Sequence, residues 1–242
     1  MSAAQELRQW NISRGANAWA EGSALVEAGQ TRVLVTASVL PEVPRFLSGS
    51  GGGWVTAEYD MLPRSTHDRR TREARRGRPD GRSLEISRLV GRAMRAAVET
   101  GYLGERTVAI DCDVLQADGG TRTAAINGAT VALVEALVWM KRQKLVAGVP
   151  LKGLIGAISV GLLHGRPVLD LAYREDRDAE VDMNVVMTSA GEFVELQGTG
   201  EKTPFSGEQL GSMLDLARAG IEKLFGLQRQ ALGDEIAAEA GL

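Results

Sequence analysis

A polar turn near the middle of the chain carries residue types suited to binding an anion. Apolar and polar residues alternate over residues 108–114, as in a half-buried strand, and Asp-Gly-Gly follows at 118–120. From Thr121 to about residue 145 apolar residues recur at helical spacing, which predicts a helix that begins at the turn. The glycines leave its first N–H groups uncovered, and Thr121 and Arg122 add a hydroxyl and a guanidinium. The pattern predicts an anion site; the alternative is an ordinary turn beside a solvated arginine.

A second cation stands at another expected helix start. Helical spacing of apolar residues begins at about Ser83, and Arg82 directly precedes it. We therefore expect a second place where a cation lies beside uncovered N–H groups.

Four acidic residues occur at even spacing: Asp176, Asp178, Glu180 and Asp182. On one strand, Asp176 and Asp182 would lie about 20 Å apart, at about 3.3 Å per residue, and could not cooperate. If the chain reverses near residue 179, the two become partners at the base of a hairpin. Carboxylates that close share a proton or bind a hard cation such as Mg²⁺ or Mn²⁺. The alternative is a hairpin loop that is merely acidic.

The positive charge of the chain is concentrated in one stretch. Residues 64–95 contain 11 Arg and four acidic residues, a net charge of +7, whereas the whole chain carries −3. Such a local field favours a polyanion guided to one place; the alternative is a solvated loop with salt bridges. Residues 66–79 have almost no apolar side chain, so we expect a surface segment that is poorly ordered without a ligand.

Composition limits the classes of protein that fit. With 242 residues and 44% hydrophobic content, the chain can build a sizeable core. A single cysteine, Cys112, excludes intramolecular disulfides and Cys-rich zinc sites, and two distant histidines suggest no local metal motif. No apolar run approaches the roughly 20 residues of a membrane span, and the first residues lack a signal-peptide pattern. We expect a cytoplasmic protein without membrane contact.

The order of predicted elements indicates an α+β fold. One domain, 1–242, is expected to hold two packed halves, 1–145 and 150–226, each with strands followed by helices, and a helical or frayed tail at 227–242. Strands are predicted over 23–27, 31–39, 54–59, 108–114, 154–163, 167–173, 181–187 and 193–197, and helices from 83, from 121 to about 145, and over 206–225.

Five stretches resemble the ribonuclease PH family of bacterial tRNA nucleotidyltransferases, which is related to polynucleotide phosphorylase and the exosome ring subunits. They read GSALVEAGQTRVLVTASV, GGGWVTAEYDMLPRSTH, GRSLEISRLVGRAMRA, LGERTVAIDCDVLQADGGTRTAAINGA and EDRDAEVDMNVVM. The resemblance implies a ribonuclease PH-like fold and a phosphate-dependent 3′→5′ exoribonuclease that trims tRNA precursors and releases nucleoside 5′-diphosphates. It also implies RNA and inorganic phosphate as partners and a hexameric ring built from dimers.

The resemblance also implies roles for individual residues. The attacking phosphate would be held by Arg82, Gly120, Thr121 and Arg122. Asp176 and Asp182 would be the catalytic and Mg²⁺-binding acids, with Asp182 as general acid toward the leaving 3′-oxygen. RNA would be guided by Arg64, Arg69 and Arg72.

Two other functions fit parts of the pattern. One is an inactive ring subunit that binds RNA without turnover, and the other is a metal-dependent hydrolase that releases monophosphates. The sequence departs from the family near its start, where Gln9 stands in place of a proline, and at Lys202.

Overall fold

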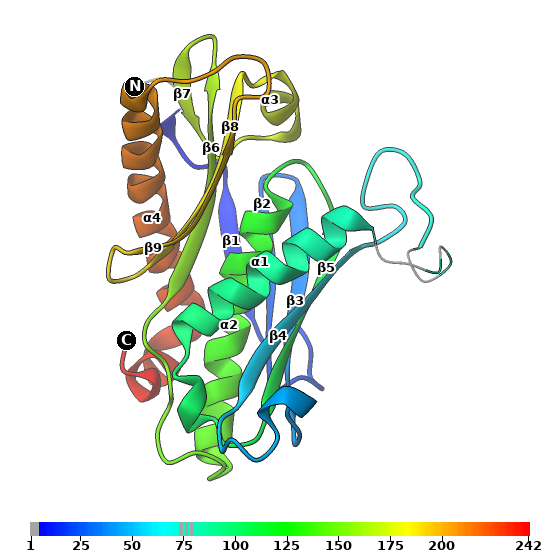
Figure 1. Cartoon of the computed structure of the whole chain (residues 1–242), viewed down its shortest axis with the longest axis vertical. Helices are drawn as coiled ribbons and strands as arrows, with labels where there is room; N and C mark the ends of the chain where they lie inside the picture. Colours follow the sequence, from blue (N-terminus) through cyan, green and yellow to red (C-terminus); the bar gives the residue numbers. More distant parts are fainter. Residues whose placement is uncertain (1–4, 73–74, 76, 78–79) are drawn as a thin grey trace.

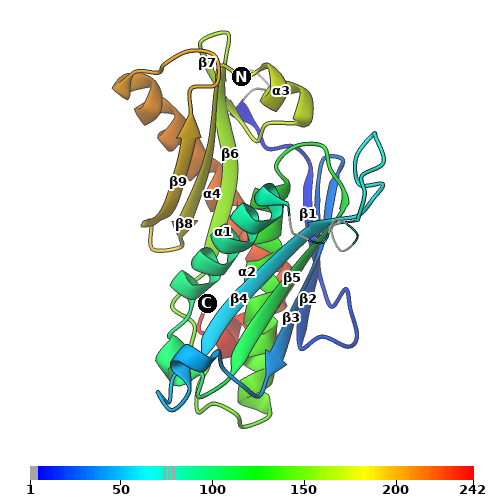
Figure 2. The ribbon, with the colours of Figure 1, turned by 45° about the vertical axis from the view of Figure 1, so that its right-hand side comes forward.

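The computed structural model describes residues 5–72, 75, 77 and 80–242. Its elements are β1 (Trp10–Arg14), β2 (Gly22–Ala28), β3 (Thr31–Leu40), η2 (Arg45–Leu47), β4 (Trp54–Met61), α1 (Gly81–Ala97), η4 (Thr100–Tyr102), β5 (Thr107–Gln116), α2 (Thr121–Arg142), β6 (Ile155–Leu163), β7 (Arg166–Leu169), α3 (Tyr173–Asp178), β8 (Val181–Thr188), β9 (Phe193–Thr199) and α4 (Gly207–Ala240). Figures 1 and 2 show two sheets with α1 and α2 between them. The predicted α+β class is confirmed.

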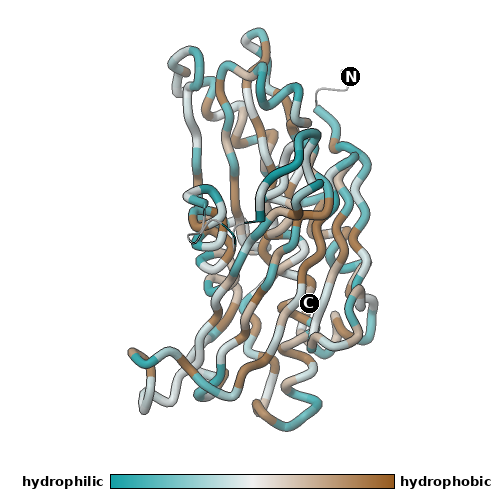
Figure 3. Tube along the Cα trace, turned by 90° about the vertical axis from the view of Figure 1, so that its right-hand side faces the viewer, coloured by the Kyte–Doolittle hydropathy of each residue, from teal (hydrophilic) through white to brown (hydrophobic). Residues whose placement is uncertain are grey.

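The first half forms a five-stranded sheet in the order β1-β2-β3-β5-β4. Its strands pair antiparallel except β4 and β5, which run parallel. Along β4, Val55, Ala57, Tyr59 and Met61 are buried and the intervening residues are not, so one face meets the core. Figure 3 shows hydrophobic positions recurring along these strands. Strand β1 was not predicted, because residues 1–20 show only a weak pattern of apolar positions.

The second half forms a four-stranded antiparallel sheet in the order β7-β6-β8-β9. Eight of the nine residues of β6 are buried, since α2 and α4 both pack on this strand. Strand β7 is shorter than the predicted 167–173: Asp170 has a left-handed φ of 57°, which ends the extended conformation. The final helix extends past the predicted residue 225 to Ala240, with non-helical backbone at Gly233.

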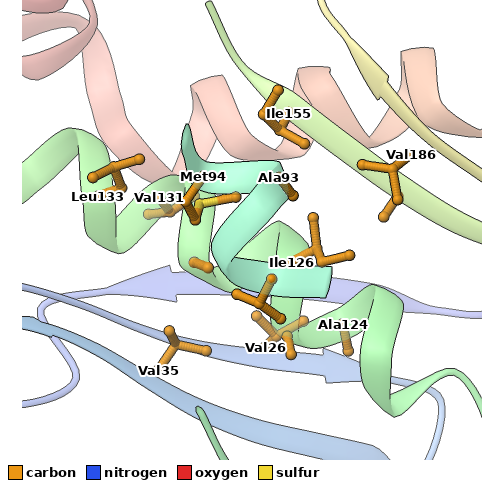
Figure 4. Packing of buried hydrophobic residues seen from close by; sticks show 14 of the residues in the cluster. Val26, Val35, Ala93, Met94, Ala124, Ile126, Val131, Leu133, Ile155 and Val186 are labelled. Atoms are coloured by element: carbon orange, nitrogen blue, oxygen red, sulfur yellow. The ribbon is translucent and has the colours of Figure 1, made fainter. Parts of the chain in front are cut away.

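Helix α2 is the core of the molecule. It packs against β2 and β3 on one side and against β6 and α4 on the other. Figure 4 shows Ile126, Val131 and Leu133 between residues of both sheets. Within the described chain, α2 is the one helix long and apolar enough for a membrane span, at a hydropathy of 1.4, and 89% of that window is buried in the protein. The expectation that no apolar run approaches that length was therefore wrong. The helix is apolar on all sides because it is buried between the two sheets.

A buried polar network fixes the helices in register. The side-chain amide of Asn127 donates to the carbonyl oxygens of Thr123 and Ala157, and Gln228 Nε2 donates to Asn127 Oδ1 at 2.8 Å. Because buried polar groups are costly when unpaired, these bonds restrict how α2, β6 and α4 slide past one another. The N-terminus of α2 thus has a defined position between the sheets.

Candidate functional site

A small cavity lies where the N-terminus of α2 meets the second sheet. Its volume is about 60 Å³, whereas one water needs roughly 10–15 Å³, so it can hold several waters or one small oxyanion. The lining residues are Arg82, Gly120, Thr121, Arg122, Ser159, Leu171, Asp176, Asp182 and Asn184. All four residues predicted to bind phosphate and both predicted acids are therefore together, from elements up to 100 positions apart in sequence.

The glycine turn is required by close packing as well as by conformation. Gly119 and Gly120 have φ of 79° and 66°, in the left-handed region that favours glycine. A Cβ on Gly119 would lie 2.6 Å from the carbonyl oxygen of Leu171. Gly120 is the N-cap of α2 and provides no side-chain cap, so the first N–H groups of the helix face the cavity without a competing acceptor from the cap residue.

Thr121 is held from behind by Tyr59. The Tyr59 hydroxyl donates to Thr121 Oγ1 at 2.8 Å, which leaves the threonine hydroxyl hydrogen available to a ligand. Burial raises the pKa of Tyr59, so it remains a donor. The sequence pattern did not point to Tyr59; the only signal was a tyrosine, with its polar tip, on the buried face of a strand.

Arg122 has a donor that the described residues leave unused. Its Nη2 lies 3.2 Å from Glu85 Oε2, and 18% of its side chain is exposed. Its Nε is buried and has no hydrogen-bond partner in the described chain. A buried unpaired donor is costly, on the order of 1–3 kcal/mol, and an anion in the adjacent cavity would satisfy it.

Arg82 reaches the site by a different route from the one expected. It lies in the first turn of α1, and Asp80, the N-cap, accepts a hydrogen bond from the Arg82 N–H at 3.4 Å. The prediction of uncovered N–H groups at this helix start was therefore wrong, because a carboxylate caps it. Arg82 still lines the cavity, and its charge opposes the burial that raises the pKa of both acids.

The two acids meet without the expected hairpin. Asp176 lies on the short helix α3, and Asp182 is the second residue of β8. Helix formation in this polar segment brings Asp176 back toward the strand, whereas a hairpin would have used residues 176–182 as its loop. Lys202 supports this helix, since its Nζ donates to the carbonyl oxygens of Arg177 and Asp178 at 3.3 and 2.7 Å.

The electrostatic environment separates the roles of the acids. Burial and then the charge of Asp176 raise the pKa of Asp182 to about 6, although Arg122 and Arg82 oppose the change. Burial also raises the pKa of Asp176, and both arginines lower it. Asp182 is therefore the acid that can hold a proton close to neutral pH.

The acid pair fits a hard divalent cation. Asp182 is partly buried and Asp176 is exposed, and the charge of Asp176 adds to the burial that raises the pKa of Asp182. A cation between the two carboxylates would relieve their repulsion. Mg²⁺ commonly binds one or two carboxylates together with phosphate oxygens of a substrate. Among the described residues no group of three or more His, Cys, Asp or Glu could hold a metal alone, so such an ion would depend on the substrate.

The predicted RNA-guiding arginines lie outside the cavity. Arg64, Arg69 and Arg72 are exposed, and none lines it. They belong to the segment after β4 that projects from the body near the start of α1 in Figure 1. The expected poor order of 66–79 stays a prediction, because residues 73–74, 76 and 78–79 lie outside the described part.

Ser159 and Asn184 also line the cavity but were missed from sequence. They are cross-strand partners on β6 and β8, and 4% and 7% of their surfaces are exposed. Their sequence context, an apolar strand, gives no signal, because only strand pairing brings them together.

The fold and the cavity define an α+β protein with anion-binding groups at a helix N-terminus beside an acid pair. Comparison with known protein families agrees with this fold and identifies one family. Residues 6–138 match domain 1 and residues 153–220 match domain 2 of the 3′ exoribonuclease family of ribonuclease PH domains. The chain belongs to this family.

Solved structures share the fold at low sequence identity. Rrp46 of rice (Oryza sativa) is 21% identical with a TM-score of 0.76, over 95% of this chain and 97% of that one. A chain of the Archaeoglobus fulgidus exosome with RNA bound to the active site is 22% identical with a TM-score of 0.77, over 93% and 90%. A chain of an archaeal exosome core is 22% identical with a TM-score of 0.73, over 93% and 88%.

Proposed function

We propose that the protein is a phosphate-dependent 3′→5′ exoribonuclease of the bacterial ribonuclease PH type, which trims the 3′ ends of tRNA precursors and other RNAs. The observation that carries this proposal is the unused, buried Nε of Arg122 at the open N-terminus of α2, next to the acid pair. The helix N-terminus and the two arginines together can bind an anion, which supports inorganic phosphate as the attacking group.

In the proposed reaction, Arg82, Gly120, Thr121 and Arg122 hold inorganic phosphate. One of its oxygens attacks the phosphorus that links the last nucleotide to the chain. The bond from that phosphorus to the 3′-oxygen of the preceding nucleotide breaks, and the products are a shortened RNA and a nucleoside 5′-diphosphate. Two anions must approach each other, so the arginines and the helix N-terminus lower the repulsion and align the oxygens.

The acids complete the site. Asp182 has a pKa raised to about 6 and can protonate the leaving 3′-oxygen, whereas burial raises the pKa of Asp176 against the opposing charges of Arg82 and Arg122. Asp176 and Asp182 would hold Mg²⁺ or Mn²⁺, which supplies charge neutralisation when bound.

RNA reaches the site past Arg64, Arg69 and Arg72 in this proposal, because exposed arginines contact the phosphate backbone without reading sequence. Two of the similar structures are of archaeal exosomes, one with RNA bound to the active site, which supports RNA binding and assembly into a ring. We propose that this ring is a hexamer. We place the activity in the cytoplasm.

To test the proposal, the protein is incubated with Mg²⁺ and an RNA that has a single-stranded 3′ tail, in phosphate buffer and in phosphate-free buffer. The length of the RNA is then measured on a denaturing gel. Shortening is expected only with phosphate and is expected to disappear in Arg122→Ala. Equal shortening without phosphate would support the hydrolase instead. RNA binding without shortening in either buffer would support the inactive ring subunit. Arg142→Ala is the control, since its ion pairs join α2 to α4 far from the cavity.

A further inference from the structure

A buried ion pair lies directly behind the glycine turn. Arg8, just before β1, and Asp170, just after β7, meet at 2.7 Å, and 15% and 0% of their side chains are exposed. Asp170 also accepts hydrogen bonds from the backbone N–H of Arg8 at 3.0 Å and from Trp10 Nε1 at 2.7 Å. The carboxylate is thus fully satisfied, and the N-terminal segment is tied to the second sheet.

The same arginine binds the turn itself. Arg8 Nη1 donates to the carbonyl oxygen of Asp118 at 2.8 Å, and the backbone N–H of Tyr173 donates to this oxygen at 3.2 Å. A Cβ on Gly120 would lie 2.8 Å from Arg8 Nη2, so the guanidinium packs directly on the turn. Arg8 and Tyr173 therefore donate to the same carbonyl oxygen, that of Asp118 in the glycine turn. Tyr173 begins the helix that carries Asp176.

Asp170 orders the other wall of the cavity. Its φ of 57° is rare for a residue with a side chain and persists only where the surroundings hold it. In this conformation its N–H donates to the Ser159 carbonyl oxygen at 2.7 Å, and the N–H of Leu171 donates to Ser159 Oγ at 3.0 Å. Ser159 and Leu171 both line the cavity.

We propose that the Arg8–Asp170 pair is a positioning device that sets the glycine turn at the correct distance from the second half of the site. Replacing a buried ion pair by apolar residues often costs no stability, so this pair is explained better by geometry than by stability. Neither side chain lines the cavity, and both act through the Asp118 carbonyl and the Ser159 contacts. The inference rests on the proposed function, because the positioned ligand is inorganic phosphate.

Arg8→Lys separates positioning from folding. A lysine keeps a positive charge beside Asp170, but its single ammonium cannot reproduce the planar fork that reaches both Asp170 and the Asp118 carbonyl. We expect the dissociation constant for inorganic phosphate, measured by calorimetry, and the phosphate KM to rise about tenfold or more, as for other residues that orient ligand-binding groups. The KM for RNA is expected to stay within about twofold.

The matched control is Arg14→Lys. Arg14 also joins the N-terminal strand to α2, through Glu135 at 3.2 Å, and it does not line the cavity. This variant should bind phosphate like the wild type. Asp170→Asn is the second test variant, since it removes the ion pair but keeps an acceptor for Trp10 Nε1.

Unchanged phosphate binding in folded Arg8→Lys and Asp170→Asn would overturn the proposal. Loss of folding in both, seen by near-UV circular dichroism, would also overturn it, because the pair would then be a requirement of the fold. If the KM for RNA rose as much as the KM for phosphate, the pair would not act specifically on the phosphate-binding turn, and the proposal would be overturned. If the wild type binds phosphate without shortening RNA, the proposed function fails, and the calorimetric comparison still decides the role of the pair.

Discussion

Replacing Asp182 by asparagine should stabilise the folded protein at neutral pH while it abolishes activity. In the folded state the pKa of Asp182 rises from its ordinary value of 3.8 to about 6. At about 1.36 kcal/mol per pKa unit, ionising this carboxyl costs the folded state about 3 kcal/mol. Asparagine is nearly isosteric and carries no charge, so the variant avoids this cost.

The sign follows from proton binding. Between pH 4 and pH 6 the folded state binds the Asp182 proton more tightly than the unfolded state does, so the wild type loses stability as pH rises through this window. The variant has no such loss. Its stability advantage should therefore grow from about 0.5 kcal/mol at pH 4 to about 3 kcal/mol at pH 7.5. Carboxyl groups that do not interact with Asp182 cancel in the difference, whereas Asp176, whose charge raises the pKa of Asp182, does not.

The assay is urea unfolding at several pH values in a metal-free, phosphate-free buffer that contains EDTA. Asp178→Asn is the control, because Asp178 is exposed and the Arg177 guanidinium lowers its pKa. That variant should gain no stability as pH rises. A stability difference between Asp182→Asn and wild type that does not change with pH would refute the electrostatic argument, and with it the role of Asp182 as proton donor.

Three further predictions concern the glycine turn, the hydrogen bond from Tyr59 to Thr121, and Arg72 in the predicted RNA-guiding segment. Gly120→Ala should lower the free energy of unfolding by about 1–2 kcal/mol, since φ is 66°, whereas Gly148→Ala, with open space around it, should change it little; equal effects in urea unfolding would contradict this. Tyr59→Phe removes a hydrogen bond to Thr121 worth about 0.5–1.5 kcal/mol, so the phosphate KM should rise about 2- to 10-fold; an unchanged KM would show that Thr121 needs no support. Arg72→Ala should make the slope of log affinity for single-stranded RNA against log salt less steep by about 0.7, measured by fluorescence anisotropy; an unchanged slope would exclude a phosphate contact.

Local chemistry made part of the site predictable. The turn before α2 was recognisable because glycines, a hydroxyl and an arginine are contiguous in sequence, and the structure brings Thr121 and Arg122 to the cavity. The strands were also predictable wherever burial alternates, as in β4 and β5. These features depend on neighbours within a few residues, where a sequence pattern carries the information.

The remainder depends on contacts between distant segments. Asp176 was expected in a hairpin, because a charged cluster between two apolar runs resembles a loop, yet capping and Lys202 favour a short helix. The partners Arg8 and Asp170 are 162 residues apart, and no local pattern connects them. Tyr59 was not predicted for the same reason, because its hydroxyl contacts Thr121 only once the fold brings β4 to the N-terminus of α2.

The central claim, that inorganic phosphate is the nucleophile, is tested most directly with ¹⁸O-labelled phosphate. The protein is incubated with Mg²⁺, labelled phosphate and an RNA with a 3′ tail, and the released nucleotides are analysed by mass spectrometry. We predict nucleoside 5′-diphosphates whose terminal phosphate carries the label. Unlabelled nucleoside monophosphates would contradict the claim.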